Sequence, residues 1–217
     1  MISVANAVQQ VVASSDFAIE GLQTGCLNLT AYASLIKGQV EQLTMKPVRR
    51  GSIVVALARL AKKYYKEAEP RDYMLLNLVS RTGLTELTYP KSLALQKRVV
   101  KLFERSDIQT APFCVATLGL GEISIVTHNN LAQSIREELR NVTPVLCLQN
   151  LSSLTLQVGI ETIDMPHQSY AVIKQLALRN ITIVEYLTSP SELTVVLHDR
   201  DLKNSFAVLH DRFFKTA

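Results

Sequence analysis

The 217-residue sequence contains only three cysteines and four histidines. Cys26, Cys114 and Cys147 are far apart and lie in apolar segments, which is typical of reduced thiols in a core rather than of disulfides or zinc ligands. None of the histidines stands at metal-ligand spacing with another histidine, a cysteine or a carboxylate. We therefore expect neither a metal ion nor any other cofactor.

The sequence also lacks the short motifs of common catalytic folds. Gly-x-Ser-x-Gly, Gly-x4-Gly-Lys-Ser/Thr and Gly-x-Gly-x-x-Gly do not occur, and Gly119-Leu120-Gly121 fits a hairpin turn better than a phosphate-binding loop. His198-Asp199 comes nearest to an acid–base pair, but adjacent residues of a strand point to opposite faces. These absences predict a protein that is not an enzyme.

Long apolar runs are missing as well. None approaches the roughly 18 residues that a membrane span requires, and the N-terminus has no signal-peptide pattern, so we expect a cytoplasmic protein without membrane contact. Because 47% of the residues are hydrophobic and 19% are charged, the chain can bury a core. Its length accommodates one large domain or two to three small ones, and three small ones fit the pattern best.

Residues 1–68 have apolar positions three and four apart, which predicts a small helical bundle. We expect Gly25 at a helix end and Thr30 as an N-cap. Short helices with tight turns resemble helix-turn-helix modules. The expected helices are near Val4–Ala13, Asp16–Thr24, Thr30–Leu43 and Ser52–Lys66.

Positive charge is concentrated in this helical segment. Residues 1–66 contain eight lysines and arginines but three acidic residues, whereas the whole chain has a net charge of +4. A basic stripe beside short helices is typical of a nucleic-acid surface, although a solvated helix face is the simpler alternative. DNA is therefore a candidate partner. The candidate nucleic-acid residues are Lys46, Arg49, Arg50, Arg59, Lys62 and Lys63.

Residues 72–150 alternate strand-like and helix-like segments. β-Branched or alternating runs predict the strands; we expect Pro90 and Ser92 to open the first helix and either Asn129 or Asn130 to cap the second. The resulting order β-α-β-β-α-β is that of a ferredoxin-like unit. The expected strands are Leu84–Tyr89, Pro112–Leu118, Ile123–His128 and Val145–Leu148, with helices through Leu95–Leu102 and Leu131–Leu139.

Residues 151–217 repeat this order at a spacing of about 70 to 76 residues but stop after the second helix. We expect Tyr73–Ser80 to cross over and supply the missing strand, with a partner chain as the alternative. Pro166 suits a first helical turn and Asp201 a cap, while Ser189-Pro190-Ser191 predicts a tight turn. The expected strands are Leu154–Ile160, Arg179–Ile183 and Glu192–His198.

This last segment resembles an ACT regulatory domain, and its ending, Leu209-His210-Asp211-Arg212-Phe213, is similar to that of aspartokinase-type regulatory domains. The resemblance implies an α+β protein in which an N-terminal helical bundle precedes two ferredoxin-like (βαββαβ) ACT-like units with antiparallel sheets, interlocked through the crossing strand. The expected domains are residues 1–68, 72–150 and 151–217, with residues 72–81 completing the last one.

In ACT domains an amino-acid effector binds near the loop between the first strand and the first helix. The corresponding segments here are Thr162–Gln168 and Thr88–Ser92, and helix amides at such a junction attract a carboxylate. Many members have a glycine where this chain has His167. The resemblance implies these ligand-binding residues: Asp164, Met165, Pro166, His167, Gln168, Asn180 and Ile181.

These observations predict a non-catalytic regulatory protein that senses an amino acid or a small metabolite and couples this to DNA binding by the helical domain. The alternative is an assembly or regulatory subunit that binds an enzyme of amino-acid metabolism and has no role with nucleic acid. We expect a homodimer, because ACT-like sheets commonly pair side by side.

Overall fold

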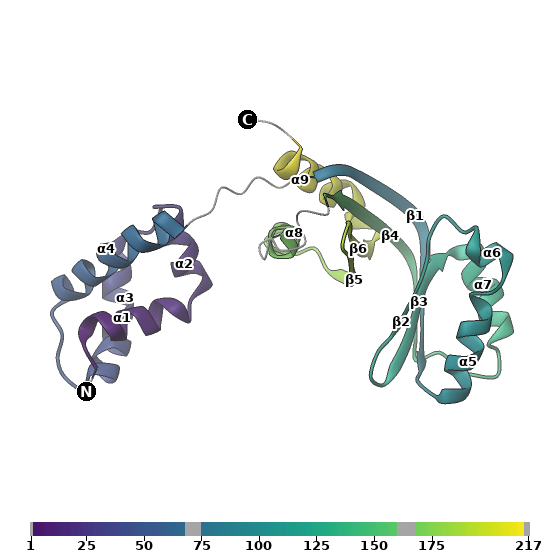
Figure 1. Ribbon diagram of the computed structural model, residues 1–217, viewed down its shortest axis with the longest axis horizontal. Coiled ribbons are helices and arrows are strands. Elements are labelled where there is room, and N and C mark those ends of the chain that lie inside the picture. Colours follow the sequence, from purple (N-terminus) through teal and green to yellow (C-terminus); the bar gives the residue numbers. More distant parts are fainter. Residues whose placement is uncertain (1, 68–74, 160–167, 215–217) are drawn as a thin grey trace. The chain divides into compact units, whose positions relative to one another are not determined.

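The computed structural model describes residues 2–67, 75–159 and 168–214 (Figure 1). The chain divides into two compact units, Met1–Asp72 and Tyr73–Ala217. The described part of the first unit is helical, and its helices pack around one apolar core that includes Val12, Leu22 and Leu57. The helices are α1 (Val4–Ala13), α2 (Asp16–Gln23), α3 (Leu29–Thr44) and α4 (Arg50–Glu67).

Polar side chains begin the first three helices. The hydroxyls of Ser3 and Ser15 cap α1 and α2, and Asn28 caps α3 because its Oδ1 accepts hydrogen bonds from two backbone N–H groups at 3.0 and 3.1 Å. The prediction that Thr30 caps this helix was therefore wrong. Gly25 follows α2 with a φ of +71°, a conformation that favours glycine, so the predicted helix end is confirmed.

The second unit contains one six-stranded antiparallel sheet in the order β2-β3-β1-β4-β6-β5. Its strands are β1 (Leu75–Pro90), β2 (Cys114–Leu118), β3 (Glu122–His128), β4 (Leu146–Val158), β5 (Ile183–Ser189) and β6 (Glu192–His198). The helices are α5 (Leu93–Leu102), α6 (Ser106–Gln109), α7 (Asn129–Glu138), α8 (Gln168–Ala177), the 3-10 turn η2 (Asp199–Asp201) and α9 (Leu202–Phe213).

Two long curved strands, β1 and β4, run side by side through the whole sheet (Figure 1). The first half of β1, Leu75–Arg81, pairs with Ser153–Val158 of β4, and the second half pairs with both β4 and β3. The described residues of the segment that was expected to cross over, 75–80, thus pair with the second half of β4. This segment is not a separate strand, however: β1 continues through Gly83, whose φ of +70° accompanies a register shift.

Apolar side chains fill both faces of the sheet. On one face Leu87 and Ile125 pack with α5 and α7, and Leu154 and Leu156 pack with α8 and α9, which gives two separate cores. Because neighbouring strand residues point to opposite faces, a third cluster lies on the helix-free face. It consists of Leu84, Val126, Leu151 and Val196, with Phe113, Leu148 and Val184 packed against it.

Two predicted helix caps were wrong. The side chain of Asn129 is hydrogen-bonded to the hydroxyl of Thr85 at 2.8 Å, and α7 begins without a side-chain cap. Asp201 already has helical backbone angles, unlike the extended backbone usual for a capping residue, and its side chain makes no cap. Its backbone carbonyl accepts a hydrogen bond from the hydroxyl of Ser205. By contrast, Ser92, one of the two residues expected to open α5, caps it, whereas Pro90 is the last residue of β1.

The three cysteines are free thiols, but they do not all lie in a core. Cys26 and Cys147 are exposed and Cys114 is partly buried, so the prediction of core thiols was wrong for the first two. Cys26 lies in the loop after Gly25, and Cys147 lies on the first half of β4, outside the part that pairs with β6. Among the described residues, no helix is both long and apolar enough to cross a membrane.

Candidate functional site

The effector site predicted for residues 151–217 lies at the junction between β4 and α8. Asp164, Met165, Pro166 and His167 fall outside the described residues. Gln168 is the first residue of α8 and is buried, and its amide Nε2 has no hydrogen-bond partner among the residues that the structure describes. The Nε2 donor of Gln168 is therefore available to an acceptor of a ligand at this junction. Such a bond would offset the free-energy cost of burying an unpartnered polar group.

Asn180 and Ile181, the other two residues of that predicted site, lie at the opposite end of α8, which is about 15 Å long. Asn180 has a φ of 55°, and its N–H donates to Ala177 at 3.0 Å. The N–H of Ile181 donates to Leu176 at 3.1 Å, and its side chain is buried in the core. These contacts end the helix. Within one chain, the structure therefore does not bring Gln168 together with Asn180 and Ile181.

The corresponding junction in residues 72–150 lies between β1 and α5, and a lysine closes it. Lys91 donates from its backbone N–H to the carbonyl of Gly121 at 2.8 Å and from Nζ to the carbonyl of Gly119 at 2.6 Å. Tyr89 is fully buried beside it; its hydroxyl has no described partner, and burial raises its pKa. The β2–β3 hairpin thus uses the charged side chain of segment 88–92, Lys91.

A polar cavity of about 370 Å³ lies between α7 and β4. The amides of Asn130, Gln133 and Gln149 can each donate and accept hydrogen bonds, and Arg136 adds a positive charge. The sequence did not single out this cavity, because its residues come from a helix and a strand that are separate in the chain. Its lining residues are Thr85, Leu87, Asn129, Asn130, Ala132, Gln133, Arg136, Cys147, Gln149 and Asn150.

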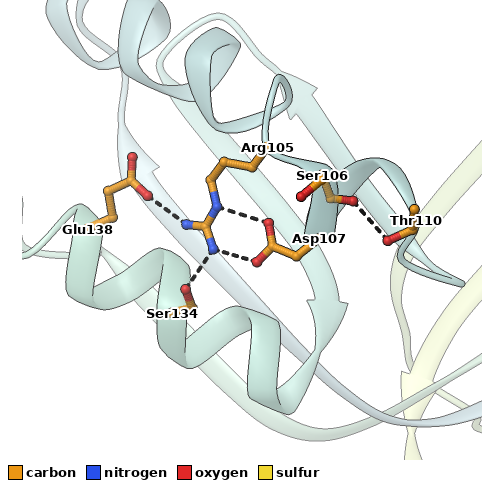
Figure 2. Close-up of polar contacts among 6 residues, drawn as sticks. All are labelled: Arg105, Ser106, Asp107, Thr110, Ser134 and Glu138. Carbon is orange, nitrogen blue, oxygen red and sulfur yellow. Dashed lines mark hydrogen bonds and ion pairs between the residues drawn. The ribbon is translucent and has the colours of Figure 1, made fainter.

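Arg105 connects α6 to α7, and four of its five N–H donors are used in this contact (Figure 2). Its guanidinium binds both carboxylate oxygens of Asp107, at 2.6 and 3.0 Å, and also Glu138 at 2.6 Å and the hydroxyl of Ser134 at 2.8 Å. The hydrogen bond from Arg105 lowers the pKa of Asp107. This network holds two helices together, so we assign it a structural role.

Two glutamates form a carboxyl pair on the helix-free face. Glu86 lies on β1 and is only 4% exposed; its Oε1 accepts a hydrogen bond from Thr88 at 3.0 Å, and its buried Oε2 has no donor among the described residues. Burial is the main cause that raises the pKa of both Glu86 and Glu185. The negative charge of the nearby Glu185 carboxylate raises the pKa of Glu86 further.

This contact joins strands that are not neighbours in the sheet. Glu86 is on β1 and Glu185 is on β5, and β4 and β6 lie between them. In a flat sheet four strands span about 14 Å, since neighbouring strands are about 4.8 Å apart. The sheet must therefore curl toward its helix-free face to bring the two carboxyl groups together.

All six predicted nucleic-acid residues are exposed. Lys46 and Arg49 lie between α3 and α4, Arg50 begins α4, and the remaining three lie on α4, away from the buried Ile53 and Leu57. Exposure is required both for a nucleic-acid surface and for a solvated helix face, so DNA binding stays a prediction.

Comparison with known proteins shows a similarity of fold. No protein-family model and no curated protein sequence matches this chain. Among solved structures, the aspartate kinase of Clostridium acetobutylicum matches with a TM-score of 0.54 and 12% identity, over 67% of this chain and 36% of that one. Aspartokinase III of E. coli, in complex with aspartate and ADP, matches with a TM-score of 0.55 and 16% identity, over 68% and 35%. This chain thus spans about a third of the length of these kinases.

A separate regulatory subunit gives a more complete match. The regulatory subunit of the aspartate kinase from Thermus thermophilus, in its ligand-free form, matches with a TM-score of 0.52 and 9% identity, over 65% of this chain and 99% of that one. The matched share of this chain is close to the size of its second unit, residues 73–217. About two thirds of the chain therefore shares the fold of an aspartate kinase regulatory subunit, with a curled antiparallel sheet and helices.

Proposed function

We propose that this chain is a non-catalytic regulatory protein whose second unit senses an amino acid or a related small metabolite. One observation carries the proposal: the fold matches a regulatory subunit over 99% of that subunit, but whole aspartate kinases over only about a third of their length. The matched region thus corresponds to nearly the whole of a protein that is a regulatory subunit of aspartate kinase.

The strand order supports two ferredoxin-like units that share one sheet. The order β2-β3-β1-β4 contains the second half of β1 and the first half of β4, and β5-β6-β4-β1 contains the other halves. We propose domain boundaries at residues 1–68, 72–150 and 151–217, with the first half of β1 completing the last domain. A ligand that binds one arrangement of the two units better than another would shift their packing.

Amino-acid sensing predicts selective stabilisation in a thermal-shift screen of the whole protein against the twenty amino acids. A ligand at 100 times its Kd stabilises the folded state by about 2.7 kcal/mol. We expect one amino acid, or a few related ones, to raise the melting temperature. Loss of the response in Asp164→Ala would locate the ligand at the junction of residues 162–168, while a screen without any response would contradict the proposal.

DNA binding by the helical unit is a second prediction, and the six exposed basic residues favour it. If they contact phosphates, Arg59→Gln, Lys62→Gln and Lys63→Gln together should weaken binding to duplex DNA and reduce the slope of log K against log salt by about 2 to 3. Equal affinity and salt dependence of the wild type and the triple variant would exclude this surface. Copurification of a protein partner would then favour docking on an enzyme of amino-acid metabolism.

A further inference from the structure

The curl of the sheet encloses a cavity of about 500 Å³ on its helix-free face. The opposite edge strands β2 and β5 both line it, at Cys114 and Val115 on one side and at Leu187 and Thr188 on the other. A cavity lined by both edges of one sheet exists only because the sheet closes toward itself. Its volume lies within the range of about 300 to 1,000 Å³ that is typical of small-molecule sites.

Arg81 supplies a guanidinium to this cavity and has no acidic partner among the described residues. The side chain is partly buried; Nη1 lies 3.5 Å from the hydroxyl of Thr155, and the guanidinium lies 5.7 Å from the centre of the Phe113 ring. Arg105, in contrast, is occupied by two carboxylates (Figure 2). The five donors of Arg81 are therefore largely unused and are held in place by an aromatic ring.

The rest of the lining complements a small zwitterion. The hydroxyls of Thr155 and Thr194 are buried and 2.9 Å apart, and each can also bind a ligand oxygen. Glu192 is exposed at the cavity; its carboxylate is 3.5 Å from the amide of Gln157 and has no ion-pair partner in the part of the chain that is described. One cavity thus contains an unpaired guanidinium and an unpaired carboxylate.

We propose that this cavity is a binding site for a small carboxylate with an amino group, in which Arg81 binds the carboxylate and Glu192 binds the ammonium. The site is separate from the strand-to-helix junctions, and it rests on the proposed function of amino-acid sensing. Guanidinium–carboxylate contacts are often bidentate and are among the stronger hydrogen bonds in proteins. A ligand here would contact both edge strands and so favour the curled form of the sheet.

The test compares the whole wild-type protein with Arg81→Gln, Arg81→Lys and Asp164→Ala. The probes are the twenty L-amino acids, their α-amides, and acetate and succinate, measured by calorimetry and by the NMR signals of arginine Nε–Hε groups. Arg200→Gln is the matched control, because Arg200 is 77% exposed and lies outside the cavity. We expect an amino acid to bind, its α-amide to bind at least about tenfold more weakly, and Arg81→Gln to weaken binding at least about tenfold.

The outcomes distinguish a failure of the proposed Arg81 site from a failure of the proposed amino-acid sensing. Binding of an amino acid that Arg81→Gln leaves unchanged and Asp164→Ala abolishes would overturn the Arg81 site and support sensing elsewhere. Binding of acetate or succinate alone, dependent on Arg81, would support the guanidinium site and contradict amino-acid sensing. If no probe binds or moves an arginine signal of the wild type, both proposals fail. Arg81→Lys, which keeps the charge, should bind more weakly than the wild type but more tightly than Arg81→Gln.

Discussion

Replacing Leu156 with alanine should lower the free energy of unfolding of the second unit by about 2 to 5 kcal/mol, as is usual for a fully buried leucine. Leu156 is 0% exposed and belongs to the core beneath α8 and α9. It pairs with Leu78 on β1 and with Leu193 on β6. The substitution therefore leaves a cavity where β1, the crossing strand, packs on the core beneath α8 and α9.

Urea denaturation combined with hydrogen exchange and mass spectrometry measures this effect, because it reports the two units separately. Leu76→Ala is the matched control: Leu76 lies on the crossing strand but is 67% exposed, so its replacement should change stability by less than about 0.5 kcal/mol. Equal effects of the two substitutions would contradict the docking of β1 on this core. Protection of the first unit should be unchanged in both variants.

Replacing Glu86 with glutamine should make the protein more stable at pH 8 and reduce the dependence of its stability on pH. The carboxyl groups of Glu86 and Glu185 have pKa values raised above the ordinary 4.5, first by burial. The charges of Glu185 and Glu122 also raise the pKa of Glu86, and the hydrogen bond from Thr88 opposes this. The neutral amide of glutamine has a similar shape and does not ionise.

The sign of this pH dependence of stability follows from proton binding. An acid whose pKa is higher in the folded protein binds more protons there, so the stability that it contributes is complete below pH 4.5 and is lost as the pH rises through the raised pKa. Each unit by which such a pKa is raised corresponds to about 1.4 kcal/mol in the free energy of unfolding. In the wild type the free energy of unfolding should therefore decrease across this window, and in Glu86→Gln it should decrease less.

Chemical denaturation at pH values from 4 to 8 measures both curves, and Glu104→Gln is the control because Glu104 is exposed. The control should follow the wild type at every pH. A Glu86→Gln curve that is parallel to the wild type would show that folding does not raise the pKa of Glu86. A loss of stability at all pH values would instead show that the amide cannot replace the hydrogen bond to Thr88.

Local sequence patterns predicted many elements of this protein correctly. The apolar periodicity of residues 4–13 predicted the bounds of α1, and Ser189-Pro190-Ser191 predicted the turn between β5 and β6. Gly25 and Ser92 have their predicted roles because a left-handed φ and a capping hydroxyl act within a few residues of the chain. The predicted cap at Thr30 failed because Asn28 supplies the capping oxygen, and the one at Asp201 failed because its backbone is already helical.

The sequence by itself determined that the chain has a helical, basic first part and a second part of alternating strands and helices with one strand displaced, because periodicity, turns and charge are local properties. Only the tertiary structure decided that Arg81 and Glu192 face one cavity and that Glu86 meets Glu185. These groups lie about 100 residues apart in sequence, and the curl of the sheet that joins them depends on the twist and packing of all six strands.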